Sequence, residues 1–207
     1  MLLTTVIFSC TKTKEVNVED TTFKPTKEVV HPTESNEVKT TVVDVAFDPA
    51  YVANGFDFPV GKPDAKGYVK EKSFGQENFL GEQWNGEKGG NKHFGDSVYS
   101  IGHGFVVLAE DLGGEWGRVI RIVHNLPTGE LIESLYAHCD SILVEQGEYV
   151  KRGDKIATMG NASGKVPTQL YLEIRTTIDL PIGNGVGEDT KGYANPTEFI
   201  ENNRSYQ

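Results

Sequence analysis

SLYAHCDSILVEQGEYVKRGDKIATMGNASGKVPTQLYLEIR, residues 134–175, is the stretch that decides the fold. It holds three short apolar or alternating runs, at 134–137, 141–145 and 169–175. The turns between these runs carry glycines at positions 147, 153, 160 and 164. Short β-prone runs at regular spacing, separated by glycine turns, predict a compact and mainly β unit.

A repeating pattern of valine and glycine lies inside this stretch. V-x-x-G-x-x-V-x-x-G-x-x-I falls on Val144, Gly147, Val150, Gly153 and Ile156. Glycine permits the backbone conformations of tight bends. The pattern therefore predicts a chain that bends twice and returns its apolar side chains to one core.

Three separated motifs resemble one known family. They are FLGEQWNG at 79–86, YAHC at 136–139 and QLYLEIR at 169–175. Their sequences and order resemble the motifs of the lysostaphin/LytM-type zinc peptidases, which cut peptidoglycan cross-bridges. The resemblance covers roughly residues 51–203. It implies a compact antiparallel β-sheet domain, of the type called a barrel-sandwich hybrid.

The zinc site of that family is not matched. The resemblance places the three zinc ligands at Phe79, Gln83 and Tyr171, and a partner histidine at Gln169. A phenyl ring has no ligating atom, a neutral amide is a poor zinc donor, and tyrosine would have to lose a proton with a pKa of about 10. Only His138 is retained. We therefore expect no zinc cofactor and no catalytic residue.

The replaced residues favour binding over cleavage. Aromatic walls with a few placed polar groups suit a peptide or glycan ligand. An alternative is that these side chains simply fill the space where the metal would lie. The expected lining combines aromatic rings and hydrogen-bonding groups: Phe79, Trp84, Tyr136, Tyr171, Gln83, Gln169 and His138.

Other catalytic chemistry has little support in the sequence. Cys139 follows His138, but adjacent side chains on a strand point to opposite faces, so a Cys–His dyad is disfavoured. If His138 faces the groove, Cys139 faces the core. A replacement zinc site from His93, His103 and His124 lacks ligand-like spacing.

Composition narrows the class of partner. The chain has 207 residues, 37% of them hydrophobic, and a formal net charge of −10. Such a charge disfavours nucleic acid, because little would neutralise the phosphates. No apolar run approaches the roughly 18 residues of a membrane-spanning helix.

The N-terminal segment resembles a bacterial lipoprotein signal. Residues 1–10 form a short apolar stretch that ends in Cys10, the expected lipidation site. The stretch is shorter than usual and lacks a basic start, which is consistent with a true start upstream of Met1. A cytosolic protein with an apolar terminus is the alternative. Residues 11–46, polar and with prolines, predict a disordered tether before a domain at 47–207.

Together these features predict a catalytically inactive, peptidase-like domain of the bacterial cell envelope. We expect a lipid-anchored protein facing the periplasm or the outside, which binds peptidoglycan or regulates a cell-wall hydrolase. One alternative is an active peptidoglycan endopeptidase with a reorganised site. Another is a lipoyl-type or adaptor β-domain that acts as an interaction module, since the valine–glycine pattern also occurs there.

Overall fold

The structure, a computed structural model, describes residues 48–205. The predicted signal with Cys10 and the predicted tether at 11–46 lie outside the described residues. The described residues all fall within the predicted domain at 47–207.

The described chain is built from antiparallel strands. The strands are β1 Tyr68–Lys72, β2 Glu82–Gly86, β3 Ser97–Tyr99, β4 Gly104–Asp111, β5 Arg118–Asn125, β6 Leu131–Ile142, β7 Tyr149–Val150, β8 Lys155–Met159, β9 Leu170–Arg175 and β10 Tyr193–Ala194. Short helical turns lie at η1 Pro49–Tyr51, η2 Gly61–Ala65, η3 Gln76–Asn78, η4 Gly90–His93 and η5 Ala162–Gly164, and the helix α1 spans Pro196–Asn202.

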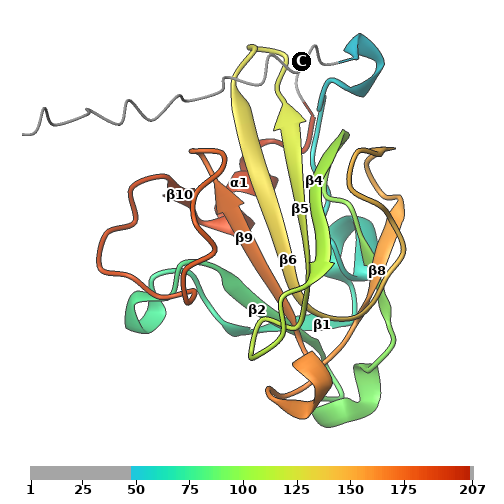
Figure 1. Ribbon diagram of the computed structural model, residues 1–207, viewed down its shortest axis with the longest axis vertical. Helices are drawn as coiled ribbons and strands as arrows, with labels where there is room; N and C mark the ends of the chain where they lie inside the picture. The colour runs from blue at the N-terminus through green and yellow to red at the C-terminus, as the bar shows by residue number, and fades with distance from the viewer. Residues whose placement is uncertain (1–47, 206–207) are drawn as a thin grey trace, which may run out of the picture. The chain divides into compact units, whose positions relative to one another are not determined.

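The strands join in one sheet with the order β1-β2-β9-β6-β5-β4-β7, while β10 pairs with β9, and β8 pairs with both β3 and β6. The long β5–β6 hairpin lies in the middle, with β9 on one side and β4 on the other (Figure 1). The prediction of a mainly β, antiparallel domain is confirmed.

Strand β9 shows how the sheet separates two environments. Leu170, Leu172 and Ile174 belong to the main apolar core. Tyr171 and the alternate residues after it point to the opposite face, because successive side chains of a strand alternate. That face is also buried: Tyr171 is 2% exposed. The second face carries the polar and aromatic groups described below.

Strand β6 differs from the sequence prediction. The runs expected at 134–137 and 141–145 are largely one strand that contains an irregularity at His138. His138 has a φ of 64°, and the pairing with β5 shifts between Tyr136 and Cys139. A shift of this kind marks a β-bulge, which re-aims the side chains next to it.

The glycine turns behave as the sequence predicts. Gly147 and Gly153 have φ angles of 95° and 80°, which glycine adopts without steric penalty. Val150 and Ile156 are buried in the main core, and Val144 packs against it. The valine–glycine pattern therefore returns its apolar residues to one core, as predicted.

A short helix closes the domain. Asn195 caps α1 by accepting a hydrogen bond from the backbone N–H of Glu198, and Pro196 occupies the first helical position. Ile200 is fully buried against the core. Within residues 48–205, none of the helices has the length and apolar content needed to cross a bilayer.

Candidate functional site

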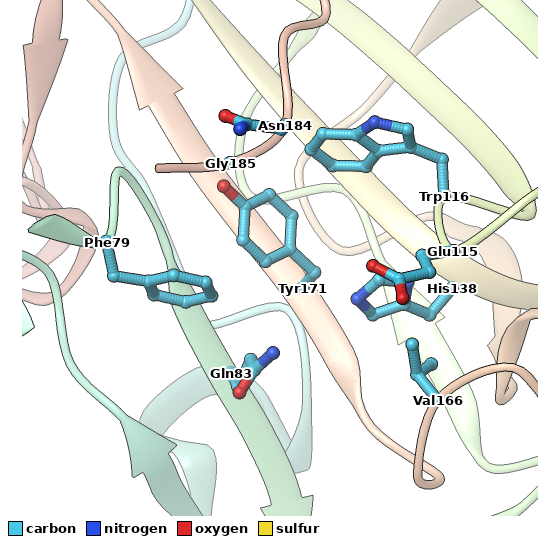
Figure 2. A pocket seen from close by; sticks show the side chains of 9 residues that line it. All are labelled: Phe79, Gln83, Glu115, Trp116, His138, Val166, Tyr171, Asn184 and Gly185. Atoms are coloured by element: carbon cyan, nitrogen blue, oxygen red, sulfur yellow. The ribbon is translucent and has the colours of Figure 1, made fainter. Parts of the chain in front are cut away.

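A pocket of about 300 Å³ opens on the second face of the sheet. Strands β2, β6 and β9 contribute Gln83, His138 and Tyr171 to it, and Phe79 comes from the segment before β2. Loops supply the rest of the lining: Glu115, Trp116, Val166, Asn184 and Gly185. Segments far apart in the sequence thus meet at one site (Figure 2).

The structure brings together the three positions that the resemblance assigns to zinc ligands. Phe79, Gln83 and Tyr171 all line this pocket, together with the retained His138. The pairing of β2 with β9 places Gln83 directly opposite Tyr171. Residues from three separated sequence motifs therefore form one spatial cluster.

Aromatic contacts define the pocket wall. Phe79 packs edge to face on Tyr171 with ring centroids 5.2 Å apart, and Trp116 packs on Tyr171 in the same way, also at 5.2 Å. The imidazole of His138 lies 5.7 Å from Tyr171. Phe79, Tyr171 and Trp116 form a row, and Gln83 and His138 lie to one side of it (Figure 2).

Trp84 is not on the pocket wall, contrary to the sequence prediction. It follows Gln83 on β2, so its side chain points to the opposite face. There it is 6% exposed, with its ring 5.5 Å from that of Phe58. Its indole N–H donates to a carboxylate oxygen of Glu82 at 3.1 Å. Trp84 is a core residue.

Tyr136 also lies in the core. The prediction placed it with His138 because residues two apart on a regular strand share a face. The bulge at His138 breaks this rule, so that Tyr136 and Cys139 both enter the main core. The Tyr136 hydroxyl accepts a hydrogen bond from the backbone N–H of Ile101 at 3.0 Å.

Gln169 stands just before β9 and is 3% exposed. Its backbone N–H donates to the carbonyl of Gly160 at 3.0 Å. It is not among the residues that line the pocket. Of the predicted binding residues, the pocket thus combines His138 and Tyr171 but not Trp84, Tyr136 or Gln169.

The sequence prediction missed Trp116 and Glu115. They lie in the β4–β5 loop, where Gly113 and Gly114 both have positive φ angles. The indole N–H of Trp116 donates to the carbonyl of Gly183 at 3.1 Å, which ties this loop to the β9–β10 loop. A tryptophan in a glycine-rich loop is the sequence feature that could have indicated this part of the site, because loops on a rigid scaffold often carry binding residues.

His138 is held in the neutral state. It is 6% exposed, and burial lowers its pKa to about 4, although the nearby backbone of Glu115 and Trp116 partly opposes that shift. Its Nδ1 atom is buried and has no hydrogen-bond partner in residues 48–205. One of its ring nitrogens points into the pocket (Figure 2). A neutral imidazole at this place can exchange a hydrogen bond with a ligand.

Cys139 faces away from the pocket, as strand alternation predicts for a residue next to the pocket-facing His138. The thiol belongs to the main core and is 2% exposed. Burial raises its pKa to about 12. Since the thiolate is the nucleophile, this thiol is poorly suited to reaction.

Tyr171 is committed to a hydrogen bond beside the pocket. Its hydroxyl donates to the carboxylate of Glu173, two residues along β9. Burial, together with the charge of Glu173, raises the pKa of Tyr171 far above its ordinary value. The phenol therefore keeps its proton and cannot serve as a phenolate ligand at neutral pH.

A buried ionic network continues from Glu173 across the sheet. Arg175 Nε donates to Glu173 at 2.7 Å, and Arg175 Nη1 donates to Glu133 at 3.3 Å and to the carbonyl of Leu180 at 2.9 Å. Arg121 makes a bidentate pair with Glu133 at 2.8 and 2.7 Å. Buried charges require such partners. The network fixes the start of the β9–β10 loop, which forms part of the pocket rim.

These residues do not fit a catalytic zinc ion. Such an ion needs three protein ligands, usually nitrogen, sulfur or carboxylate oxygen. Phe79 offers none, Tyr171 holds its proton, and Gln83 offers a neutral amide. Within residues 48–205, no three His, Cys, Asp or Glu side chains are grouped so that they could hold a metal ion.

Comparison with known proteins defines the class. Residues 84–185 match the family model described as peptidase family M23. The lipoprotein NlpD of Yersinia enterocolitica is 40% identical over 81 residues, which are 39% of this chain and 78% of that protein. The chain belongs to peptidase family M23, and the predicted resemblance is confirmed.

Two further similarities extend this assignment. The murein hydrolase activator NlpD of Salmonella dublin is 37% identical over 100 residues, which are 45% of this chain and 25% of that protein. The matched part of the chain thus spans about a quarter of that relative. A chain in the crystal structure of the SpoIIIAH–SpoIIQ complex has a TM-score of 0.52 at 20% identity, covers 70% of this chain and 99% of its own length, and shows the shared fold.

Proposed function

We propose that this chain is a catalytically inactive member of family M23 that regulates a cell-wall hydrolase in the bacterial envelope. One observation carries the proposal. The positions that the resemblance gives to zinc ligands, Phe79, Gln83 and Tyr171, line one pocket and offer no ligand set for zinc. The fold is thus retained while the residues suit binding. Two relatives, one named as a lipoprotein and one as a murein hydrolase activator, support a regulatory role in the cell envelope.

The pocket has the properties of a protein-binding site. Aromatic rings fixed by mutual packing lose little conformational entropy when a partner binds, and such rings dominate interface energetics. Trp116 is the most accessible of them, because it stands in a loop at the rim. The side chain of Trp116 is therefore the expected main contact for a hydrolase.

The first test measures hydrolysis. The purified chain alone, with and without added zinc, should release no fragments from dye-labelled peptidoglycan. Addition of the chain to a purified cell-wall hydrolase from the same organism should raise the release rate several-fold. Chelator-sensitive release by the chain alone would instead establish an active endopeptidase.

The second test locates the contact. Trp116→Ala should lower the affinity for the hydrolase about thirtyfold, as expected for an aromatic anchor worth about 2 kcal/mol. Leu143→Ala is the matched control, since Leu143 is an exposed apolar residue that does not line the pocket. If the chain co-sediments with peptidoglycan and activates no hydrolase, the pocket binds peptidoglycan instead.

A third test concerns the membrane. We propose that Cys10 is lipidated, because it ends a short apolar stretch that resembles a lipoprotein signal. Cys10→Ala should then move the protein from the membrane fraction to the soluble fraction. An identical soluble distribution of both forms would contradict the anchor.

A further inference from the structure

The pocket wall presents several aromatic rings at right angles to one another. The ring planes of Phe79 and Tyr171 meet at 83°, and those of Trp116 and Tyr171 at 76°. An aromatic ring carries negative potential on its face and positive potential on its edge. Several aromatic rings around one space can hold a cation over their faces, as in the aromatic cages that hold alkylated ammonium groups.

The charge of the lining has the same preference. Glu115, the residue before Trp116, brings an exposed carboxylate to the same pocket lining as His138 (Figure 2). His138 and Tyr171 remain neutral, because burial shifts the pKa of each away from its charged form. Among residues 48–205, no Lys or Arg lines the pocket. The lining is thus negative at neutral pH, within a chain of net charge −10.

One ring of the wall already holds an ammonium group of the chain itself. Lys72 Nζ lies 4.7 Å from the ring centroid of Phe79 and pairs with Glu77 at 2.9 Å. Lys72 is not among the residues that line the pocket. The charge of Lys72 is offset by Glu77. The pocket can therefore accept a further cation without an unpaired positive charge beside it.

We infer that the pocket of Phe79, Trp116, Tyr171 and Glu115 recognises a basic side chain, lysine or arginine, presented by the hydrolase partner. The aromatic rings hold the charged head, and the carboxylate of Glu115 pairs with it at the rim. A nitrogen of His138 that points into the pocket accepts a hydrogen bond from the ligand's N–H group. This inference rests on the proposed function, because it names the chemistry by which the partner is bound.

The pocket is tested directly with n-butylammonium, which reproduces the end of a lysine side chain, and with n-butanol, its neutral counterpart. The indole N–H resonance of Trp116 reports binding, and that of Trp84, buried on the other face of the sheet, is the internal reference. We expect n-butylammonium to shift only the Trp116 resonance, with a millimolar dissociation constant. Equal shifts with n-butanol would overturn the inference, because they would show an apolar pocket without preference for charge.

Two variants separate the contributions of charge and rings. Glu115→Gln should weaken n-butylammonium binding up to about fivefold, the range of an exposed ion pair. Phe79→Leu, which keeps an apolar side chain but removes the ring, should weaken it about threefold or more. Glu110→Gln, an exposed carboxylate on β4 that does not line the pocket, should have no effect. Unchanged binding by both pocket variants would refute the cation site.

The partner is tested with a charge reversal. Glu115→Lys should lower hydrolase affinity at least tenfold, and Glu110→Lys should leave it within about twofold. If the hydrolase binds the wild-type chain and Glu115→Lys equally, the cation site is wrong while the proposed function stands. If no hydrolase binds but n-butylammonium does, the proposed function fails and so does the assignment of a hydrolase side chain, although the cation preference of the pocket is still measured.

Discussion

Replacing the two tryptophans one at a time tests whether one of them stabilises the fold while the other binds the partner. The chain has only Trp84 and Trp116. Trp84 directly follows the pocket residue Gln83 on β2, but its side chain lies in the core on the opposite face of the sheet. Trp116 lines the pocket itself from the β4–β5 loop. Trp84→Ala should destabilise the fold, whereas Trp116→Ala should chiefly weaken binding.

The expected loss of unfolding free energy in Trp84→Ala follows from the surroundings of this side chain. The side chain is 6% exposed and packs in the main core. A tryptophan that buries about 150–250 Å² contributes about 4–6 kcal/mol at 25 cal/mol per Å², and measured Trp→Ala changes are about 3–5 kcal/mol. The lost hydrogen bond to Glu82 has little further effect, because Glu82 keeps Lys70 at 2.9 Å and Thr197 at 2.8 Å.

The corresponding loss for Trp116 is smaller. Trp116 is partly exposed, and its indole N–H donates a hydrogen bond to the carbonyl of Gly183. One such bond is worth about 1 kcal/mol net, so Trp116→Ala should lower the unfolding free energy by about 1–2 kcal/mol. The variant therefore remains folded enough for binding measurements.

Urea unfolding followed by far-ultraviolet circular dichroism measures both free energies, and hydrolase titration measures affinity in the folded fraction. Trp84→Phe provides a folded variant if Trp84→Ala fails to fold. We expect the Trp84 variants to keep wild-type affinity. A larger stability loss for Trp116→Ala than for Trp84→Ala, or lost affinity in folded Trp84→Phe, would refute the assignment of faces.

Other predictions concern buried polar groups. Arg175→Ala should lower the unfolding free energy by about 3–5 kcal/mol, measured in urea, because it leaves the buried carboxylate of Glu173 without its arginine partner, while Glu133 keeps Arg121. In the Cys10→Ala variant, Cys139 should resist iodoacetamide at pH 8 until urea unfolds the chain, and modification of the folded protein would contradict burial. The folded pKa values of His138 and His124, about 4, lie below the ordinary 6.5, so the unfolded chain binds protons first. Unfolding free energy should therefore fall by about 1–2 kcal/mol per imidazole from pH 7 to pH 5, and His138→Gln should lack its share.

The sequence by itself determined the family and the class of fold. The family followed from the resemblance of three separated motifs in the right order. The class of fold followed from the glycine turns and the valine–glycine pattern, because turn positions and apolar spacing are local properties of the chain. Gly147 and Gly153 form turns where the glycine pattern predicts them. The loss of ligand types at Phe79 and Gln83 could likewise be stated from residue identity alone.

Only the tertiary structure decided which side chains share the pocket. Strand alternation sends Gln83 to the pocket and Trp84 to the core, and the bulge at His138 separates that residue from Tyr136. Neither the register between strands nor a one-residue bulge is encoded in local propensity, since both depend on which strands pair. Trp116 reaches the site because the β4–β5 loop meets the β9–β10 loop, 67 residues later in the chain. Contacts between residues so far apart in the sequence depend on the folded sheet, and local residue patterns do not predict them.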